Sequence, residues 1–239
     1  MIVGQNFKQK VSTESDLLAG YDNIYENEAM AADEICFYKK VVAIVLKYVN
    51  KGRLLDISCG RGFVVDIARQ KGFQSCGLDL APKAIELASK MYPECSFVQG
   101  SSERLPFYDC EFDVITNLGS LEHYLDMEIA IRESVRVLKD TGIAIYMMPN
   151  QYFLPSIIKV LFRGDPNDKL QPIERFASKI EWKGLLENNG LKVLKIEKYN
   201  QKAKGKGLLG FIYNSFIFTI PFNLSYCLIY ICKKNLTEE

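Results

Sequence analysis

Apolar residues switch between two spacings along the chain from residue 53 onward. Runs such as RLLDIS (53–58) and FDVITNLG (112–119) are short and rich in the aliphatic and β-branched types that favour strands. Between such runs, apolar residues recur every three or four positions, as Val64, Ile67 and Ala68 do, which is typical of one helix face. Gly and Pro turn signals separate the two kinds of segment. The alternation predicts an α/β fold built on a mostly parallel sheet.

The same pattern predicts the order of the elements. Strands are expected at 53–58, 74–79, 95–100, 112–119, 143–148, 191–200 and 225–232. Helices are expected at about 35–49, from Gly62 to Lys71, from Pro82 to Met91, at about 127–139, and around Trp182 until Gly190. In the helix that starts at Pro82, the spacing of Ile85, Ala88 and Met91 predicts one buried stripe.

Two regions depart from the regular alternation. Residues 151–175 contain Pro155, Pro166 and Pro172, which predicts a loop with a short helix rather than a regular crossover. Residues 1–50 read as helical segments that could form a lid over the open edge of a site. We expect the whole chain to form one domain, with 151–176 and 201–224 as insertions that shape a pocket.

An uncharged run extends from Gly207 to Cys232, with lysines on both sides. Its length alone would allow a membrane span. Asn214 and Pro221 interrupt it, and its last residues are of strand-forming types. A buried helix followed by a strand is therefore favoured, and a helix lying on a membrane surface through 207–224 is the intermediate alternative.

Composition excludes several classes of protein. The 239 residues are 48% hydrophobic and 25% charged, which suits a globular protein with a sizeable core. Lys+Arg 30 against Asp+Glu 29 gives a net charge of +1, so we expect no nucleic-acid partner. The seven cysteines contain no CxxC pair, and the first residues lack the pattern of a secretory signal. We expect reduced thiols and a cytoplasmic location, with membrane association as the alternative.

The segment LLDISCGRG carries the clearest chemistry. A strand enters a turn with Gly60 and Gly62 at the start of a helix, where backbone N–H groups face a ligand. Asp56, just before the turn, suits a cationic ligand better than a pyrophosphate. Asp79 follows Gly60 by 19 residues, at the end of the next strand, where an acid accepts hydrogen bonds from ribose hydroxyls. The pattern favours a nucleoside without phosphate; alternatively, both acids only cap the following helices.

A dinucleotide is less favoured, because the loop has Val65 where a further glycine is wanted. LLDISCGRG, GLDLAPKAIELA, QGSSERLPFYDCEFDVITNLGSLEH and VLKDTGIAIYMMPN together resemble the successive motifs of the class I S-adenosylmethionine-dependent methyltransferases over about residues 21–200. The resemblance implies a Rossmann-like three-layer sandwich, whose seven-stranded, mostly parallel sheet has an antiparallel last strand and helices on both faces. It is nearest to the branch that methylates small molecules and lipid-like metabolites, and it implies a cofactor-binding core over 51–150.

The resemblance also implies a set of residues that surround S-adenosylmethionine. The methionine part would be surrounded by Asp56, Ser58, Cys59, Gly60 and Gly62, and the ribose held by Asp79. The remaining expected contacts are Leu80, Ser101, Ser102 and Glu103 around the adenine, Asn117 and Leu118 on the sulfonium side, and Tyr25, with Tyr21, closing from the N-terminal segment. Ser58 replaces a usual glycine, and Ser101 stands where many relatives have Asp.

His123 is the single histidine, and it follows the fourth predicted strand. An imidazole there could take a proton from an acceptor hydroxyl, which makes His123 the candidate catalytic base. It could instead cap the following helix or fix the loop. Glu122 and His123 are similar to a metal-binding segment of some relatives, but Gly119 replaces the additional upstream Glu, so we expect no metal.

The resulting functional hypothesis is transfer of a methyl group from S-adenosylmethionine, by in-line displacement, to an O, N or C atom of a small or amphipathic metabolite. S-adenosylhomocysteine would be the product. The apolar segment 208–224 favours a lipid-like acceptor, although that segment could equally pack on the sheet. A sugar or another natural-product intermediate is the alternative acceptor. A non-catalytic S-adenosylmethionine-binding module is the alternative class of function.

Overall fold

The computed structural model describes residues 13, 18, 32–164, 173–201, 214–217 and 219–236. Seven strands form one sheet in the order β3-β2-β1-β4-β5-β7-β6. They are β1 (Gly52–Ile57), β2 (Phe73–Asp79), β3 (Ser96–Gln99), β4 (Phe112–Leu118), β5 (Leu138–Pro149), β6 (Leu191–Tyr199) and β7 (Cys227–Lys234). The last strand, β7, runs antiparallel to both of its neighbours, and the other pairs are parallel. The predicted fold class is confirmed.

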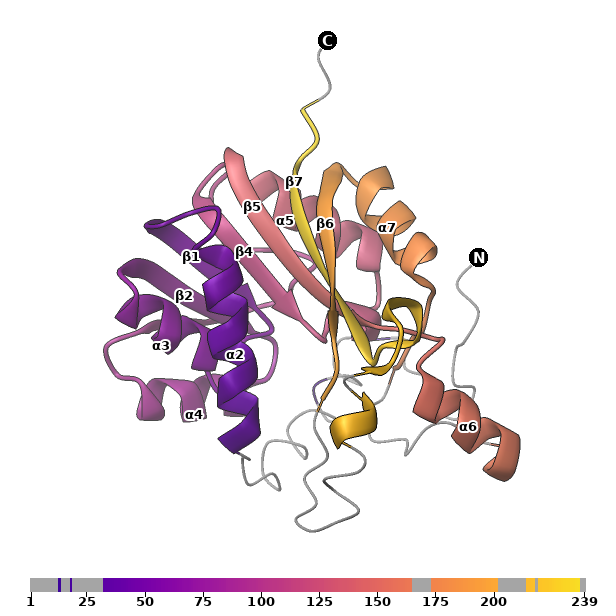
Figure 1. Cartoon of the computed structure of the whole chain (residues 1–239). Coiled ribbons are helices and arrows are strands. Elements are labelled where there is room, and N and C mark those ends of the chain that lie inside the picture. The colour runs from indigo at the N-terminus through magenta and orange to yellow at the C-terminus, as the bar shows by residue number, and fades with distance from the viewer. Residues whose placement is uncertain are drawn as a thin grey trace.

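Helices cover both faces of the sheet (Figure 1). The described helices are α2 (Ala32–Val45), α3 (Phe63–Gln70), α4 (Pro82–Met91), α5 (Met127–Val137), α6 (Leu154–Arg163) and α7 (Lys179–Asn188), with the 3-10 turns η1 (Leu121–His123) and η2 (Phe222–Leu224). Alternate strand residues enter two separate cores. Leu55 and Ile115 pack in the core shared with α5 and α7, whereas Leu54 and Val114 pack in the core shared with α2 and α3.

Local signals account for most helix ends. Pro82 occupies the first turn of α4, as predicted. Asp126 caps α5 by accepting a hydrogen bond from the Ile129 N–H at 2.9 Å. Ser178 and Glu181 form a complete capping box at the start of α7. These caps pair backbone N–H groups that a helix start leaves without partners.

Two details of the sequence prediction are wrong. Of the stripe predicted in α4, Ala88 is buried and Ile85 is half-buried, but Met91 is 47% exposed because the helix ends there; Ala84 is buried as well. The helix expected at about 127–139 ends at Val137, and β5 begins at Leu138. Leu138 already pairs with Phe112, and the pairing register shifts between Phe112 and Val114.

The uncharged run after Gly207 is only partly described. Residues 207–213 and 218 lie outside the described residues, as does most of the proposed lid over 1–50. Ile217 and Ile220 are buried, and the end of the run forms β7, as expected. Within the described part of the chain, every helix is too short or too polar to cross a bilayer. The short helix expected between 151 and 175 is α6.

Candidate functional site

The carboxyl ends of β1, β2 and β4 bring the predicted acidic residues together. β1 lies between β2 and β4, so the direction of the strand order reverses at this point of the sheet. Asp56 lies next to the end of β1, where its register partners are Gly77 and Thr116. Asp79 ends β2, and Asn117 lies near the end of β4. This edge is where open α/β sheets hold ligands.

The turn after β1 has an unusual backbone. Ser58, Gly60 and Gly62 have φ angles of 59°, 52° and 78°, the left-handed region that glycine adopts readily. A Cβ on Gly62 would lie 2.6 Å from the ring of Phe97, so a side chain is excluded there. No side chain caps α3, which starts directly after Gly62. Its first N–H groups therefore face the site.

Ser58 keeps the left-handed conformation without being glycine, and a hydrogen-bond network surrounds it. Its Oγ lies 2.8 Å from the Tyr124 hydroxyl. The same hydroxyl accepts a hydrogen bond from Asn117 Nδ2 at 2.6 Å and lies 3.3 Å from Ser120 Oγ. Burial raises the pKa of Tyr124 to about 12, so the phenol is neutral. The network joins the turn after β1 to the loop after β4.

Asp79 holds the turn as well as facing the site. Its Oδ2 accepts a hydrogen bond from the Gly60 N–H at 2.8 Å, and its Oδ1 accepts one from the Ala81 N–H at 3.0 Å. Burial raises the pKa of the carboxyl, while these backbone hydrogen bonds act in the opposite direction. A carboxylate oxygen accepts more than one hydrogen bond, so the capping role leaves acceptor capacity for ribose hydroxyls.

Asp56 is the second buried acid of the site. Thr116 Oγ1 donates a hydrogen bond to its Oδ1 at 2.6 Å. Burial raises the pKa of Asp56 to about 7; the Thr116 hydrogen bond opposes this effect and the charge of Asp79 adds to it. Burial also raises the pKa of the Cys59 thiol well above its usual value, which does not suit a nucleophile. Two buried acids this close, one of which raises the pKa of the other, favour a cationic ligand.

The loop between β3 and β4 contributes less directly. Ser101 Oγ accepts a hydrogen bond from the Glu103 N–H at 3.3 Å, and Ser102 is buried within hydrogen-bond reach of Tyr124. Glu103 Oε1 accepts a hydrogen bond from the Asp126 N–H at 3.0 Å, so one of its oxygens fixes the start of α5. Of the other predicted contacts, Leu80 and Leu118 lie half-buried at the ends of β2 and β4, while Tyr21 and Tyr25 lie outside the described residues. The roles of all these residues toward a cofactor stay predictions.

His123 lies in η1 and is buried. Its Nδ1 is hydrogen-bonded to the Ile173 carbonyl, and its Nε2 lies 3.7 Å from Glu122 Oε1. Burial, together with the charge of Arg175, lowers the pKa of His123 to about 4, so the imidazole is neutral at pH 7. A neutral imidazole can accept a proton, and the Ile173 contact also fits the alternative loop-fixing role.

Glu122 and Arg175 are residues that sequence reasoning did not assign. Burial raises the pKa of Glu122 to about 8, and its buried Oε2 has no hydrogen-bond partner among the described residues. Arg175 donates hydrogen bonds to the carbonyls of Glu122, Tyr124 and Leu125. It therefore holds the loop after β4 from a position 50 residues away along the chain. Local spacing carries no signal for such a contact.

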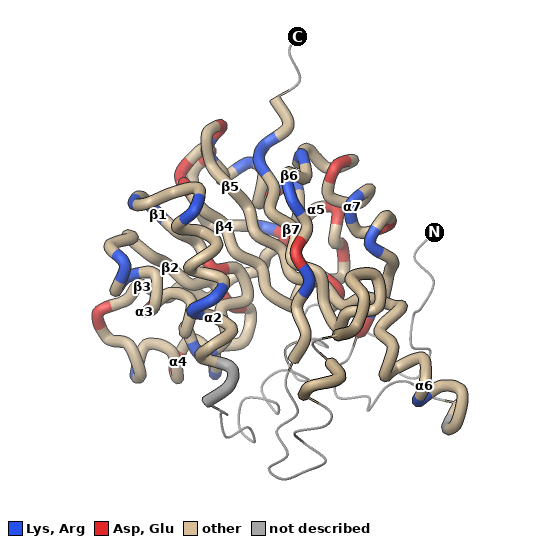
Figure 2. Tube along the Cα trace, in the orientation of Figure 1, with Lys and Arg blue, Asp and Glu red and all other residues tan. Residues whose placement is uncertain are grey.

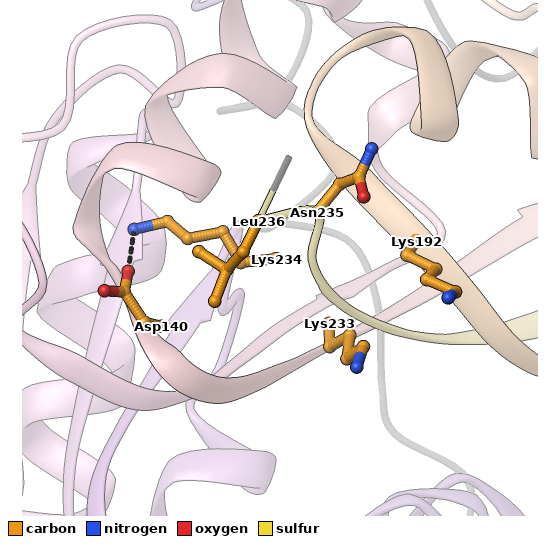
Figure 3. Close-up of a pocket in the computed structure, with 6 residues that line it drawn as sticks. All are labelled: Asp140, Lys192, Lys233, Lys234, Asn235 and Leu236. Atoms are coloured by element: carbon orange, nitrogen blue, oxygen red, sulfur yellow. Dashed lines mark hydrogen bonds and ion pairs between the residues drawn. The ribbon is translucent and has the colours of Figure 1, made fainter. Parts of the chain in front are cut away.

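A shallow depression lies at the opposite end of the sheet (Figure 3). Its lining comes from the start of β6, the end of β7 and Asp140 in β5, and consists of Asp140, Lys192, Lys233, Lys234, Asn235 and Leu236. Lys234 Nζ pairs with Asp140 Oδ1 at 3.0 Å. None of the predicted site residues lies there. In the described residues, no three His, Cys, Asp or Glu side chains are grouped as a metal site.

Comparison with known proteins identifies the domain. Residues 55–146 match the family described as "Methyltransferase domain". A segment is 36% identical over 106 residues to the demethylmenaquinone methyltransferase of Thermotoga maritima, covering 44% of this chain and 46% of that protein. Another segment is 33% identical over 158 residues to the uncharacterized methyltransferase YcgJ of Bacillus subtilis, covering 62% of this chain and 60% of that protein.

A solved structure extends the similarity of fold. The putative methyltransferase of Haloferax volcanii, solved in complex with the Trm112 methyltransferase activator, has a TM-score of 0.68 at 16% identity, covering 93% of this chain and 99% of that chain. The matches to the curated relatives span about half of those relatives' length. The matched segment, the sheet order and the glycine turn between two acids make this chain similar to the class I S-adenosylmethionine-dependent methyltransferases.

Proposed function

We propose that this protein transfers a methyl group from S-adenosylmethionine to an O, N or C atom of a small or amphipathic metabolite. The observation that carries the proposal is the pair of buried acids, Asp56 and Asp79, on either side of a left-handed glycine turn. When bound, S-adenosylmethionine supplies a methyl group already activated by the sulfonium.

The residues present fit this cofactor. Asp56, buried beside another acid, gains a favourable partner when a cationic amino group lies next to it. Asp79 has acceptor capacity for the two ribose hydroxyls. Gly60 and Gly62 let the backbone approach the ligand closely, and the start of α3 presents N–H groups to its carboxylate.

The chain's own contribution to the reaction is alignment and exclusion of water. His123, neutral at pH 7, would accept a proton from an acceptor hydroxyl where the acceptor has one to lose. Glu122, which burial keeps largely protonated at pH 7, would add little negative charge beside that imidazole.

For the acceptor, we propose a lipid-like or quinone-like molecule. Two observations support this proposal: the relative named demethylmenaquinone methyltransferase, and the apolar character of 208–224, where Phe216 is exposed. Peripheral membrane contact through 207–224 belongs to the same proposal. A sugar or another natural-product intermediate is the second acceptor class.

Isothermal calorimetry with S-adenosylmethionine and S-adenosylhomocysteine, and with NAD as a control, tests the proposal. We expect micromolar binding of the first two, worth about 8 kcal/mol, and none of NAD. Asp79→Asn should weaken binding at least about tenfold, because ribose recognition loses a carboxylate. Asp113→Asn is the matched control: Asp113 holds the Arg53 N–H and Lys139 at the opposite end of β4. Equal affinity of both variants would refute the site assignment.

The second candidate is a non-catalytic binding module. It is favoured by the engagement of His123 Nδ1 with the Ile173 carbonyl, which ties the one imidazole to the fold. Binding of S-adenosylhomocysteine without methylation of any alcohol, phenol, amine or sugar in a broad panel would support the module. Methylation of one class would identify the acceptor.

A further inference from the structure

Helix α6 presents an apolar face to solvent. Leu154, Ile157, Ile158, Leu161 and Phe162 follow the spacing i, i+3, i+4, i+7 and i+8, which places them on one side of the helix. In a globular protein such a face normally turns toward the core. Here Leu161 is 75% exposed, Phe162 84% and Ile158 42%, and no residue of α6 whose side chain is described is fully buried.

The place of α6 in the fold sets this face apart from scattered surface residues. It follows the end of β5, at the edge of the sheet that carries the candidate site, and projects from the body of the fold (Figure 1). Its base is anchored where the rings of Phe153 and Tyr226 lie 5.1 Å apart in an edge-to-face contact. Tyr152, next to this contact, is half exposed. Aromatic rings with a polar tip are favoured at the boundary between water and lipid.

The charged residues in and around α6 favour an anionic partner. From Pro149 to Gly164 the charged residues are Lys159 and Arg163, and none is acidic. Figure 2 accordingly shows no red on α6. By helical spacing, Lys159 lies on the side away from Leu161 and next to Phe162, at the border of the apolar face. An apolar face with a lysine at its border, on a helix too short to span, is an arrangement that suits a helix lying in a membrane interface.

We propose that α6 docks this protein on an anionic lipid bilayer, with Leu161 and Phe162 inserted and Lys159, at the border of the apolar face, at the level of the headgroups. Helix α6 is a different segment of the chain from 207–224, and this proposal does not depend on the proposed methyl transfer. Docking through α6 would turn the carboxyl edge of the sheet, and the site it carries, toward the membrane.

Vesicle sedimentation of the full chain, without cofactor, tests the proposal. The vesicles contain phosphatidylcholine and phosphatidylglycerol in equal parts, or phosphatidylcholine alone. We expect binding to the anionic vesicles, weakened by salt and by removal of phosphatidylglycerol. Leu161→Ser with Phe162→Ser should weaken binding at least about tenfold, because the inserted apolar area is lost.

Tyr108→Ser with Ile180→Ser is the matched control. Tyr108 is 85% exposed and Ile180 is 76% exposed, so the pair resembles Phe162 and Leu161 in exposed apolar area but lies elsewhere. Both double variants should unfold at the wild-type temperature, and the control should bind vesicles like the wild type. Absence of vesicle binding by the wild type, or equal binding by both variants, overturns the proposal.

A contact between two copies of the chain would give a different result. Light scattering would then show a dimer that Leu161→Ser with Phe162→Ser dissolves, and the wild type would not sediment with vesicles; this outcome also overturns the proposal. Cofactor calorimetry on the same proteins keeps the two proposals apart, because loss of vesicle binding with normal S-adenosylmethionine binding affects only the membrane proposal.

Discussion

Glu122 makes the stability of this fold depend on pH in a direction opposite to that of an ordinary salt-bridged acid. Its carboxyl is buried, and burial raises its pKa from 4.5 to about 8. The folded state therefore keeps a proton that the unfolded state releases above about pH 4.5. Rising pH favours the unfolded state throughout this window, and the loss is complete above about pH 8. Glu122→Gln removes this dependence while keeping the size of the side chain.

The magnitude follows from the two pKa values. One pKa unit corresponds to about 1.4 kcal/mol, so the whole shift is worth about 5 kcal/mol. Between about pH 5.5 and about pH 7.5, the wild type should lose about 2 to 3 kcal/mol of unfolding free energy relative to Glu122→Gln. His123, whose folded pKa is lowered, acts in the other direction as pH falls, but it is present in both proteins.

Urea denaturation at a series of pH values measures this difference directly. Glu128→Gln provides the matched control, because Glu128 has a 62% exposed side chain in the same part of the chain. Its pH profile should run parallel to that of the wild type. A parallel profile for Glu122→Gln as well would show that the Glu122 carboxyl is ionised in the folded state, and the account of its burial would fail.

Substitutions at three positions, two in the turn after β1 and one in α7, give further expected outcomes. Ser58→Gly should leave the unfolding free energy within about 0.5 kcal/mol of the wild-type value, because glycine relieves the left-handed backbone and this offsets the lost hydrogen bond to Tyr124. Ser58→Ala loses the hydrogen bond without that relief and should lower the unfolding free energy by about 1 kcal/mol. Urea denaturation of both variants separates the two effects. Gly62→Ala should destabilise by about 2 kcal/mol, since its φ is 78° and the Phe97 ring would lie 2.6 Å from the new Cβ; an unchanged melting temperature would contradict this. Gly184→Ala, inside α7 with nothing within 4 Å of the new Cβ, should stabilise by about 1 kcal/mol in the same thermal assay.

Much of the fold follows from patterns that are local in sequence. Strand runs alternate with helix faces because each element has to bury one side against the sheet. Signals such as Pro82 or the Gly190 stop fix element ends through backbone geometry alone. The errors came where tertiary pairing overrode the local pattern, as when Leu138 joined β5 by pairing with Phe112.

The candidate site could be predicted only in part, for the same reason. Asp56 and Asp79 follow strands directly, so their meeting at one edge is a consequence of parallel pairing. Tyr124 contacts Ser58, and Arg175 contacts the Tyr124 carbonyl, across long separations in the chain. No periodicity in the sequence predicts such contacts. Glu122 Oε2 is buried without a hydrogen-bond partner among the described residues, and this depends on what packs around it, which the sequence next to Glu122 does not encode.

Asp56 and Glu122 are two buried carboxyls of the candidate site that differ in their neighbours. Burial raises the pKa of both carboxyls toward neutrality. Asp56 lies beside Asp79 and an open helix start, so a cationic ligand would restore its charge and gain binding energy from it. Glu122 lies beside a neutral His123, under a loop that Arg175 fixes through backbone carbonyls alone. The hydrogen bonds of Arg175 thus go to backbone carbonyls, and burial decides the charge of the Glu122 carboxyl, which keeps its proton at neutral pH.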